Sequence, residues 1–334
     1  MLSSNQSGSS RLAMPAPSVE IGLHLPSALA WGLGGVVGVL VLGTLAAWLA
    51  PRFKPGKDFS ELRLRVWSWW VMVALVAAAL VAGWPALTLL FAFVSFVALR
   101  EFLSLAPIRS EDRLVVLFAY LSVPVAYGLV AADLYGIYLV AIPVWFFLIT
   151  PFLMALAGQT RGYLPTVSVF NWGVVTCVYN LGVIPMLMRT PDAEAPAGAA
   201  GMVFLLLFAT EANDVLQYVC GKLFGRRKIL PKVSPNKTWE GFLGGWALTA
   251  LLIAFLAPLF TPLALGPSVL LAVLLPLAGF AGDVTMSAVK RDLGVKDTSH
   301  FIPGHGGVLD RVDSLTFTAP LYFHVLAYYA LAKY

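Results

Sequence analysis

Polar residues that could do chemistry gather in two segments of the chain, residues 211–241 and 282–314. In the second segment, a continuous helix would carry a carboxylate, a hydroxyl and two cations on one face, because their spacing is i, i+4, i+7 and i+8. These residues are Asp283, Ser287, Lys290 and Arg291. Carboxylates can hold Mg²⁺ against phosphate oxygens, and lysine and arginine stabilise phosphate charge. The pattern therefore indicates a metal–phosphate site.

A glycine-rich turn and a second pair of acids complete this segment. Asp310 and Asp313 are spaced i, i+3, so a helix would converge them at the start of an apolar stretch. Residues 303–307 read Pro-Gly-His-Gly-Gly, and such glycines let the backbone approach a ligand. His305 is interpreted as a hydrogen-bonding turn residue rather than a catalyst. The sequence shows no Cys/His ligand set for zinc.

The first segment places acids inside an apolar stretch. Glu211, Asp214 and Tyr218 share one helical face. A carboxylate within a membrane span costs about 2.5–3.5 kcal/mol, so two of them in one turn need a cation or a water-filled cavity. The alternative is a snorkelling or internally paired acid near the helix end.

A basic loop follows these acids. Residues 221–240 carry six basic residues, including Lys222 and Lys237, with interspersed glycines that suit an anion. A juxtamembrane segment that touches anionic lipid heads would look similar. The run from Ser234 to Gly241 mixes turn formers with hydroxyls, which favours a nucleotide site over a pure charge tether.

Composition makes lipid the solvent for much of the chain. Of its 334 residues, 59% are hydrophobic and 12% charged, and the mean hydropathy is +0.84, whereas soluble domains carry about 25% charged residues. We expect an all-α, polytopic transmembrane helical bundle of about nine or ten spanning helices. The candidate spans are 25–50, 67–84, 85–100, 114–131, 134–157, 169–187, 200–220, 241–260, 263–284 and 314–332.

Charge placement supports this count. With ten spans, 19 of the 22 Lys and Arg residues fall in loops on one side, and only Arg11, Arg189 and Lys333 lie on the other. The positive-inside rule then puts loops 221–240 and 285–313 in the cytoplasm and both termini outside. We expect a flexible polar tail at 1–23, N-terminal transmembrane helices at 24–200 and a catalytic transmembrane region at 201–334. Because the positive charges are spread between apolar segments, no nucleic-acid partner is expected.

The run from Ser287 to Asp313 resembles the hallmark motif of phosphatidate cytidylyltransferases, also called CDP-diacylglycerol synthases. Its parts here are Ser287, Lys290-Arg291, Lys296-Asp297, Pro303-Gly304-His305-Gly306-Gly307 and Asp310-Arg311-Val312-Asp313. The run from Ser234 to Gly241 looks like another loop of this family, and the resemblance covers about residues 210–315. Where many members have Asp-x-x-Ala-Tyr, this chain has Asp214-Val-Leu-Gln217-Tyr218, which indicates a divergent subfamily.

The resemblance implies an activity, a cofactor and a set of roles. The chain would transfer the cytidylyl group of CTP to phosphatidic acid at the cytoplasmic face of a plasma or inner membrane, for phospholipid biosynthesis. Mg²⁺ would be the cofactor, with a second, monovalent cation and a homodimer left open. Asp283, Asp310 and Asp214 would hold the metal, and the catalytic set would be Asp283, Asp310, Lys290 and Arg291. Substrate contacts would come from Ser234, Lys237, Ser287, Lys296, Arg311 and Lys222.

Two alternatives remain at this stage. An ion-coupled transporter using Glu211, Asp214 and Asp283 would need polar residues on many helices, whereas here they cluster at one face. A CTP-dependent kinase for a lipid alcohol would release CDP, whereas a cytidylyltransferase releases pyrophosphate.

Overall fold

The computed structural model describes residues 26–53, 58–158, 160–191 and 195–331, and the predicted tail at 1–23 lies outside this part. Nine helical stretches in it are long and apolar enough to span a membrane, which confirms the predicted all-α bundle. They are α1 (Ser27–Phe53), α2 (Ser60–Ala82), α3 (Trp84–Leu105), α4 (Arg113–Ala131), α5 to α6 (Tyr135–Val140 and Phe147–Leu156, joined by the π-helical η2, Ala141–Phe146), α7 to α8 (Tyr163–Val174 and Asn180–Leu187, joined by η3, Val175–Tyr179), α9 (Gly198–Phe224), α10 (Trp239–Phe260) and α11 (Leu265–Asp292).

The tenth predicted span, 314–332, corresponds to a shorter helix. The four-residue α12 (Leu309–Val312) leads into α13 (Leu315–Tyr329), whose 15 residues are fewer than the roughly 20 that cross a bilayer. α13 packs against α8, α9 and α11. Neighbouring helices therefore cover much of this short helix.

The helix boundaries differ from the predictions mainly where charges adjoin an apolar stretch. α2 and α3 both extend further toward the basic loops than 67–84 and 85–100. They meet at Gly83, whose φ of 89° is a conformation that glycine adopts without steric cost. Pro85 stands in the first turn of α3, where a missing N–H costs no hydrogen bond.

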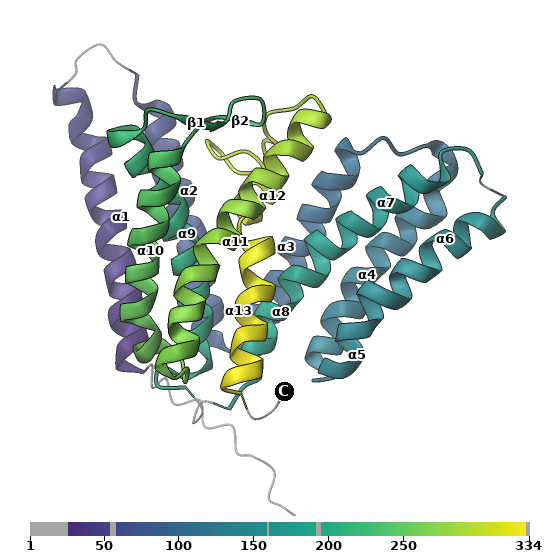
Figure 1. The fold of residues 1–334 in the computed structure, drawn as a ribbon, viewed down its shortest axis with the longest axis horizontal. Helices are drawn as coiled ribbons and strands as arrows, with labels where there is room; N and C mark the ends of the chain where they lie inside the picture. Colours follow the sequence, from purple (N-terminus) through teal and green to yellow (C-terminus); the bar gives the residue numbers. More distant parts are fainter. Residues whose placement is uncertain (1–25, 54–57, 159, 192–194, 332–334) are drawn as a thin grey trace, which may run out of the picture.

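Figure 1 shows the helices as two groups. One contains α1, α2, α9, α10, α11 and α13, and the other contains α4 to α7, with α3 and α8 between them. One end of the bundle, here called the loop end, is where α2, α7 and α10 begin and α3, α9 and α11 finish. The first described turn of α1 and the last turn of α13 lie at the opposite end.

A small sheet at the loop end was absent from the sequence prediction. Strands β1 (Lys228–Leu230) and β2 (Ser234–Thr238) form an antiparallel hairpin with an irregular register between Lys228 and Leu230. Strands of three and five residues are too short to give a clear alternating pattern, so the sequence predicts a loop here. The hairpin places part of the predicted basic loop on a defined backbone.

Candidate active site

A pocket of about 530 Å³ lies at the loop end, enclosed by α9, α10, α11 and the hairpin. Its polar lining combines two carboxylates with three lysines, and aromatic rings form much of the remainder. The lining includes Asp214, Asp283, Lys222, Lys228, Lys237, Tyr218, Phe242 and Phe280. A cavity of this size suits a small-molecule ligand, and the lysines favour an anionic one. It brings together Asp214 of α9, the basic loop and the start of the second polar segment.

Glycines let the helices around this pocket approach one another closely. A Cβ at Gly245 of α10 would lie 2.4 Å from Gln217 Cγ, and one at Gly241 would lie 2.8 Å from the Gln217 carbonyl oxygen. Thr238 caps α10 by accepting a hydrogen bond from Gly241 N at 3.2 Å. The hairpin is thereby fixed to the first turn of α10.

Lys237 and Asp283 form the polar contact at the pocket's inner wall. Lys237 Nζ lies 2.6 Å from Asp283 Oδ2 and 4.8 Å from the centre of the Phe280 ring. Ser287 Oγ donates to Asp283 Oδ1 at 3.2 Å, so these two residues share a helical face of α11 as predicted. Lys222 lines the same pocket from the last turn of α9 and lies near the Tyr218 ring.

Several acids lie around Asp283. Asp214 interacts electrostatically with Asp283 and Glu211, and Asp313 with Asp283 and Asp214. Ser314 Oγ donates to Asp214 Oδ2 at 2.8 Å, whereas the buried Asp214 Oδ1 has no hydrogen-bond partner among the described residues. A Cβ at Gly282 would lie 2.5 Å from the Asp313 carbonyl oxygen, so α11 packs directly on this segment.

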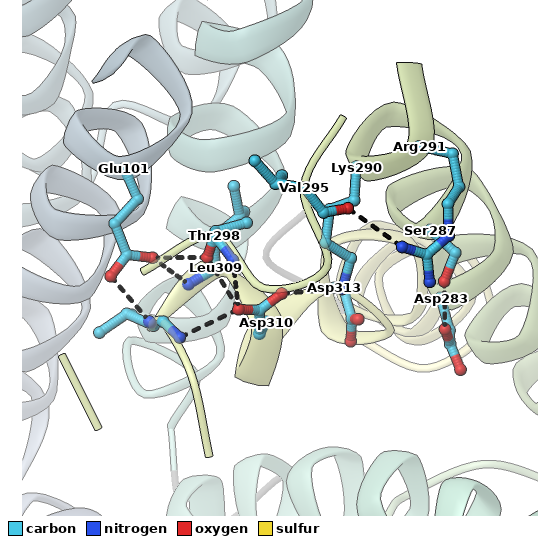
Figure 2. A network of polar contacts seen from close by, with 12 residues as sticks. Glu101, Asp283, Ser287, Lys290, Arg291, Val295, Thr298, Leu309, Asp310 and Asp313 are labelled. Carbon is cyan, nitrogen blue, oxygen red and sulfur yellow. Dashed lines mark hydrogen bonds and ion pairs between the residues drawn. The ribbon is translucent and has the colours of Figure 1, made fainter. Parts of the chain in front are cut away.

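Asp310 occupies a different environment, although it shares a motif with Asp313. Its Oδ1 accepts from Lys290 Nζ at 2.8 Å. Its Oδ2 accepts from Thr298 N at 2.7 Å, Thr298 Oγ1 at 2.9 Å and Gly307 N at 3.0 Å. The i, i+3 spacing therefore does not converge the two acids on one group. Figure 2 shows Asp310 turned toward Thr298 and Asp283 lying beside Ser287.

Opposing effects act on the Asp310 carboxyl. Burial by itself would raise its pKa, but the hydrogen bond and charge of Lys290, with the N–H groups of Gly307 and Thr298, hold that pKa below its usual range. The metal role given to Asp310 stays a prediction, and in this conformation its oxygens already lie within hydrogen-bond distance of four donors. Asp313 is the motif residue that lies with Asp214 and Asp283.

Glu101 joins this network from α3 and was not among the predicted site residues. Its Oε1 accepts from Ser299 Oγ at 2.7 Å and Val308 N at 3.0 Å, and its Oε2 accepts from Leu309 N at 2.8 Å and Thr298 Oγ1 at 3.1 Å. Its side chain is buried. The available sequence signal was an acid at the end of a predicted span, which alone does not name a partner about 200 residues away.

The remaining predicted residues divide by position. Arg291 donates to the carbonyl oxygens of Val233 and Val295, so it ties α11 to the hairpin and to the following loop. Lys296 is exposed, and Ser234 pairs with Leu230 in the hairpin, outside the pocket lining. Arg311 is half-buried, and its Nε has no hydrogen-bond partner among the described residues.

The turn at residues 303–307 docks on α2. Ser68 Oγ donates to the Pro303 carbonyl oxygen at 2.7 Å, and the rings of Trp69 and His305 meet edge to face at 6.0 Å. Burial, together with the charges of Arg311 and Arg65, lowers the pKa of His305. The imidazole is therefore neutral at neutral pH.

The acids around Asp283 fit a divalent cation that is shared with a ligand. Within the described ranges, no three His, Cys, Asp or Glu side chains are arranged to hold a metal ion on their own. Mg²⁺ commonly takes one or two carboxylates and completes its shell with phosphate oxygens and water. The unpartnered Asp214 Oδ1 and the Asp283 carboxylate are suitable oxygen donors for such an ion.

The bundle and its pocket define a polytopic membrane protein with a pocket lined by lysines and carboxylates at one end of its helices. The chain belongs to the cytidylyltransferase family, whose pattern matches residues 63–329. It is thus a member of a class of enzymes that transfer nucleotidyl groups. Its match begins within α2, well before the segment on which the sequence resemblance rested.

Three relatives illustrate the range of similarity. An uncharacterized protein, YnbB of Escherichia coli, is 39% identical over 302 residues, which cover 89% of this chain and 97% of that protein. The phosphatidate cytidylyltransferase of Haemophilus influenzae is 45% identical over 37% of this chain and 45% of its own length. That of Pseudomonas aeruginosa is 41% identical over 38% of this chain and 48% of its own length. The match thus spans less than half of either phosphatidate cytidylyltransferase.

Proposed function

We propose that this protein transfers the cytidylyl group of CTP to phosphatidic acid, releasing pyrophosphate and forming CDP-diacylglycerol. The observation that carries the proposal is the pocket whose lining combines Lys222, Lys228 and Lys237 with Asp214 and Asp283. Cations suited to phosphates and carboxylates suited to a divalent ion are the two components that a nucleoside triphosphate requires. The relatives named phosphatidate cytidylyltransferase support phosphatidic acid as the acceptor.

The loop end is proposed to face the cytoplasm. Of the 18 Lys and Arg residues in the described ranges, all except Arg189 lie in or beside the loops of this end, as the positive-inside rule requires of a cytoplasmic face. CTP is water-soluble and the acceptor is a membrane lipid, so a pocket at the ends of membrane helices is where both can meet. The described ends of α1 and α13 then lie toward the outside.

The proposed reaction is an in-line displacement. A non-bridging oxygen of the lipid phosphate bonds to the α-phosphorus of CTP, the bond from that phosphorus to the α–β bridging oxygen breaks, and pyrophosphate departs with the electron pair. A phosphomonoester is largely dianionic near neutral pH, so no strong general base is needed. Catalysis then rests on positioning and charge stabilisation.

The residues of the pocket divide this work. Lys222, Lys228 and Lys237 bind and orient the triphosphate, and Lys237 releases Asp283 as it turns toward phosphate oxygens. Asp214 and Asp283 are proposed to hold Mg²⁺, which would stabilise negative charge on the phosphates. Lys290 is held by Asp310 and stays close to the acids.

The test uses purified full-length protein in detergent with labelled CTP and a panel of lipids. Phosphatidic acid should yield CDP-diacylglycerol and pyrophosphate in equal amounts, and turnover should require Mg²⁺. Diacylglycerol tested in the same way detects the lipid kinase, which would release CDP instead. Pyrophosphate formed only with another phospholipid would show that this lipid, not phosphatidic acid, is the acceptor. No turnover with any phospholipid would overturn the proposal.

A further inference from the structure

We propose that Glu101 of α3 is a positioning residue for the transfer reaction, acting through the loop that carries Thr298 and Asp310. The inference rests on the proposed function for its reaction and on the contacts of Glu101 for its geometry. Glu101 lies in the part of the chain predicted only to span the membrane, and it contacts residues about 200 positions further along. The active site would then be assembled by both parts of the chain.

The contacts of Glu101 require a carboxylate rather than any polar side chain. Both of its oxygens accept hydrogen bonds, and two of the four donors are the backbone N–H groups of Val308 and Leu309. The other two are the hydroxyls of Thr298 and Ser299. A glutamine would present an NH₂ group to some of these donors, because an amide has only one acceptor oxygen. A buried donor without an acceptor is unfavourable, so the loop would shift.

Thr298 transmits the position of Glu101 to Asp310. Its Oγ1 lies 3.1 Å from Glu101 Oε2 and 2.9 Å from Asp310 Oδ2, and a hydroxyl has one hydrogen for the two carboxylates. Its backbone N–H also donates to Asp310. Figure 2 shows Thr298 between the two acids. A displacement of Glu101 would therefore change the hydrogen bonds of Asp310, which in turn holds Lys290.

Glycine makes this close arrangement possible. A Cβ at Gly307 would lie 2.2 Å from Thr298 Oγ1 and 2.4 Å from Glu101 Oε2, both shorter than any real contact of a Cβ. Gly307 N meanwhile donates to Asp310. The turn therefore packs its backbone directly on the carboxylate from α3.

The same contacts set the start of α12. Val308 and Leu309, whose N–H groups bind Glu101, immediately precede Asp310, and Asp313 follows one turn later. Asp313 lies close enough to Asp214 and Asp283 to interact with both. Glu101 therefore sits at the beginning of the segment that brings a third acid to the pocket's carboxylates, which is the basis for a catalytic rather than a purely structural consequence.

The experiment compares Glu101→Gln with Asp112→Asn in the full-length protein. Asp112 is a matched control, because it is also a buried carboxylate at the loop end, where it binds Arg109. Turnover number, KM for CTP, thermal unfolding and hydrogen–deuterium exchange of residues 297–309 are measured for each. Glu101→Gln should lower the turnover number about 10- to 100-fold, as loss of a supporting partner commonly does. The KM for CTP should change far less, because the lysines of the pocket stand on α9 and the hairpin.

Exchange and a second variant separate the outcomes. In Glu101→Gln, residues 297–309 should exchange faster, whereas Asp112→Asn should leave both exchange there and turnover near wild type. Thr298→Val, which removes only the shared hydroxyl, should lower turnover in the same direction, and its effect should not add fully to that of Glu101→Gln. Thr298→Val also tests the inference if the Glu101→Gln protein does not fold.

Three results would overturn the inference: wild-type turnover in Glu101→Gln, unchanged exchange in residues 297–309, or the same turnover loss in Asp112→Asn. Failure of the proposed function looks different, because the wild-type protein would then give no product from CTP and phosphatidic acid. Exchange of residues 297–309 would still decide whether Glu101 holds the loop.

Discussion

Two groups of carboxylates lie at the loop end, and they differ in how fully the protein satisfies them. Glu101 and Asp310 each lie within hydrogen-bond distance of four donors, and they share one of these, the Thr298 hydroxyl. Among the described residues, the Asp283 carboxylate has two polar partners, Ser287 and Lys237, and one oxygen of Asp214 has none. Carboxylates that are fully hydrogen-bonded suit a positioning role, whereas those with free acceptor capacity suit an added cation or ligand.

Substitutions of the two acids with free acceptor capacity, Asp214 and Asp283, should have the largest effect on turnover. Asp283→Asn and Asp214→Asn should each lower turnover about 100-fold or more, because each removes charge that is preorganised for the transition state. Thermal stability should stay the same or rise in Asp214→Asn, since a buried acid with an unmet acceptor is costly. Asp283→Asn also removes the ion-pair partner of Lys237, so its unfolding temperature should fall slightly. Turnover and unfolding are compared with the exposed Asp292→Asn as control. Near-normal turnover in both pocket variants would place the chemistry elsewhere.

Gly307→Ala tests the hydrogen-bonded carboxylates, Glu101 and Asp310. Its Cβ would collide with Thr298 and Glu101, so turnover should fall by roughly 10-fold or more and the unfolding temperature should drop with it. Gly266→Ala is the control, because a Cβ there meets nothing within 4 Å. The variants are compared by turnover and by thermal melting in the same detergent. A stable, fully active Gly307→Ala protein would show that the turn tolerates a different packing.

Lys237→Gln tests the proposed role of the pocket lysines in binding the phosphates of CTP. Loss of one phosphate-binding cation should raise the KM for CTP by about 10-fold, which corresponds to roughly 1.4 kcal/mol of binding free energy. The exposed Lys232→Gln, outside the pocket lining, should leave KM unchanged. Initial rates over a range of CTP concentrations measure the effect, and equal KM values in the two variants would contradict the assignment of Lys237.

The smallest effect concerns acid pH. Because the native pKa of Asp310 is lowered, its unfolded form binds protons at higher pH than its native form does. Its contribution to stability is therefore complete above the unfolded pKa, about 3.9, and is lost as the pH falls through the lower native value. Thermal melting between pH 5 and 3 should show a steeper loss in wild type than in Asp310→Asn. Parallel melting curves in the two proteins would show that Asp310 does not contribute to the loss of stability at low pH.

The sequence predicted the parts of the site that are local and periodic. The helical spacing of Asp283 and Ser287 appears in α11, and Asp214 of α9 lines the pocket with the basic loop. Helix periodicity could not identify partners across the fold. It predicted that Asp310 and Asp313 lie together, whereas the two acids lie in different environments. It also overlooked the hairpin, because strands of three and five residues leave too short a pattern.

The contribution of Glu101 was hidden for a related reason. Nothing near residue 101 indicates the backbone N–H groups of Val308 and Leu309, which only the tertiary structure brings to it. The apolar stretches and the charge bias of the loops, by contrast, needed no tertiary information. In the described part of the chain, the ten predicted spans correspond to nine membrane-length helices and the short helix α13. Long-range polar contacts thus lie beyond what spacing alone can predict.

The separation of 207 positions between Glu101 and Val308 also has a consequence for biosynthesis. The ribosome delivers α3 to the membrane well before it has made the donors that satisfy this acid. Until they arrive, the Glu101 carboxylate lacks the partners that satisfy it in the folded protein and needs water in their place. Docking of residues 298–309 on α3 is therefore a late event in assembly, and a nascent chain that stops short of residue 298 would expose an unsatisfied acid to cellular quality control.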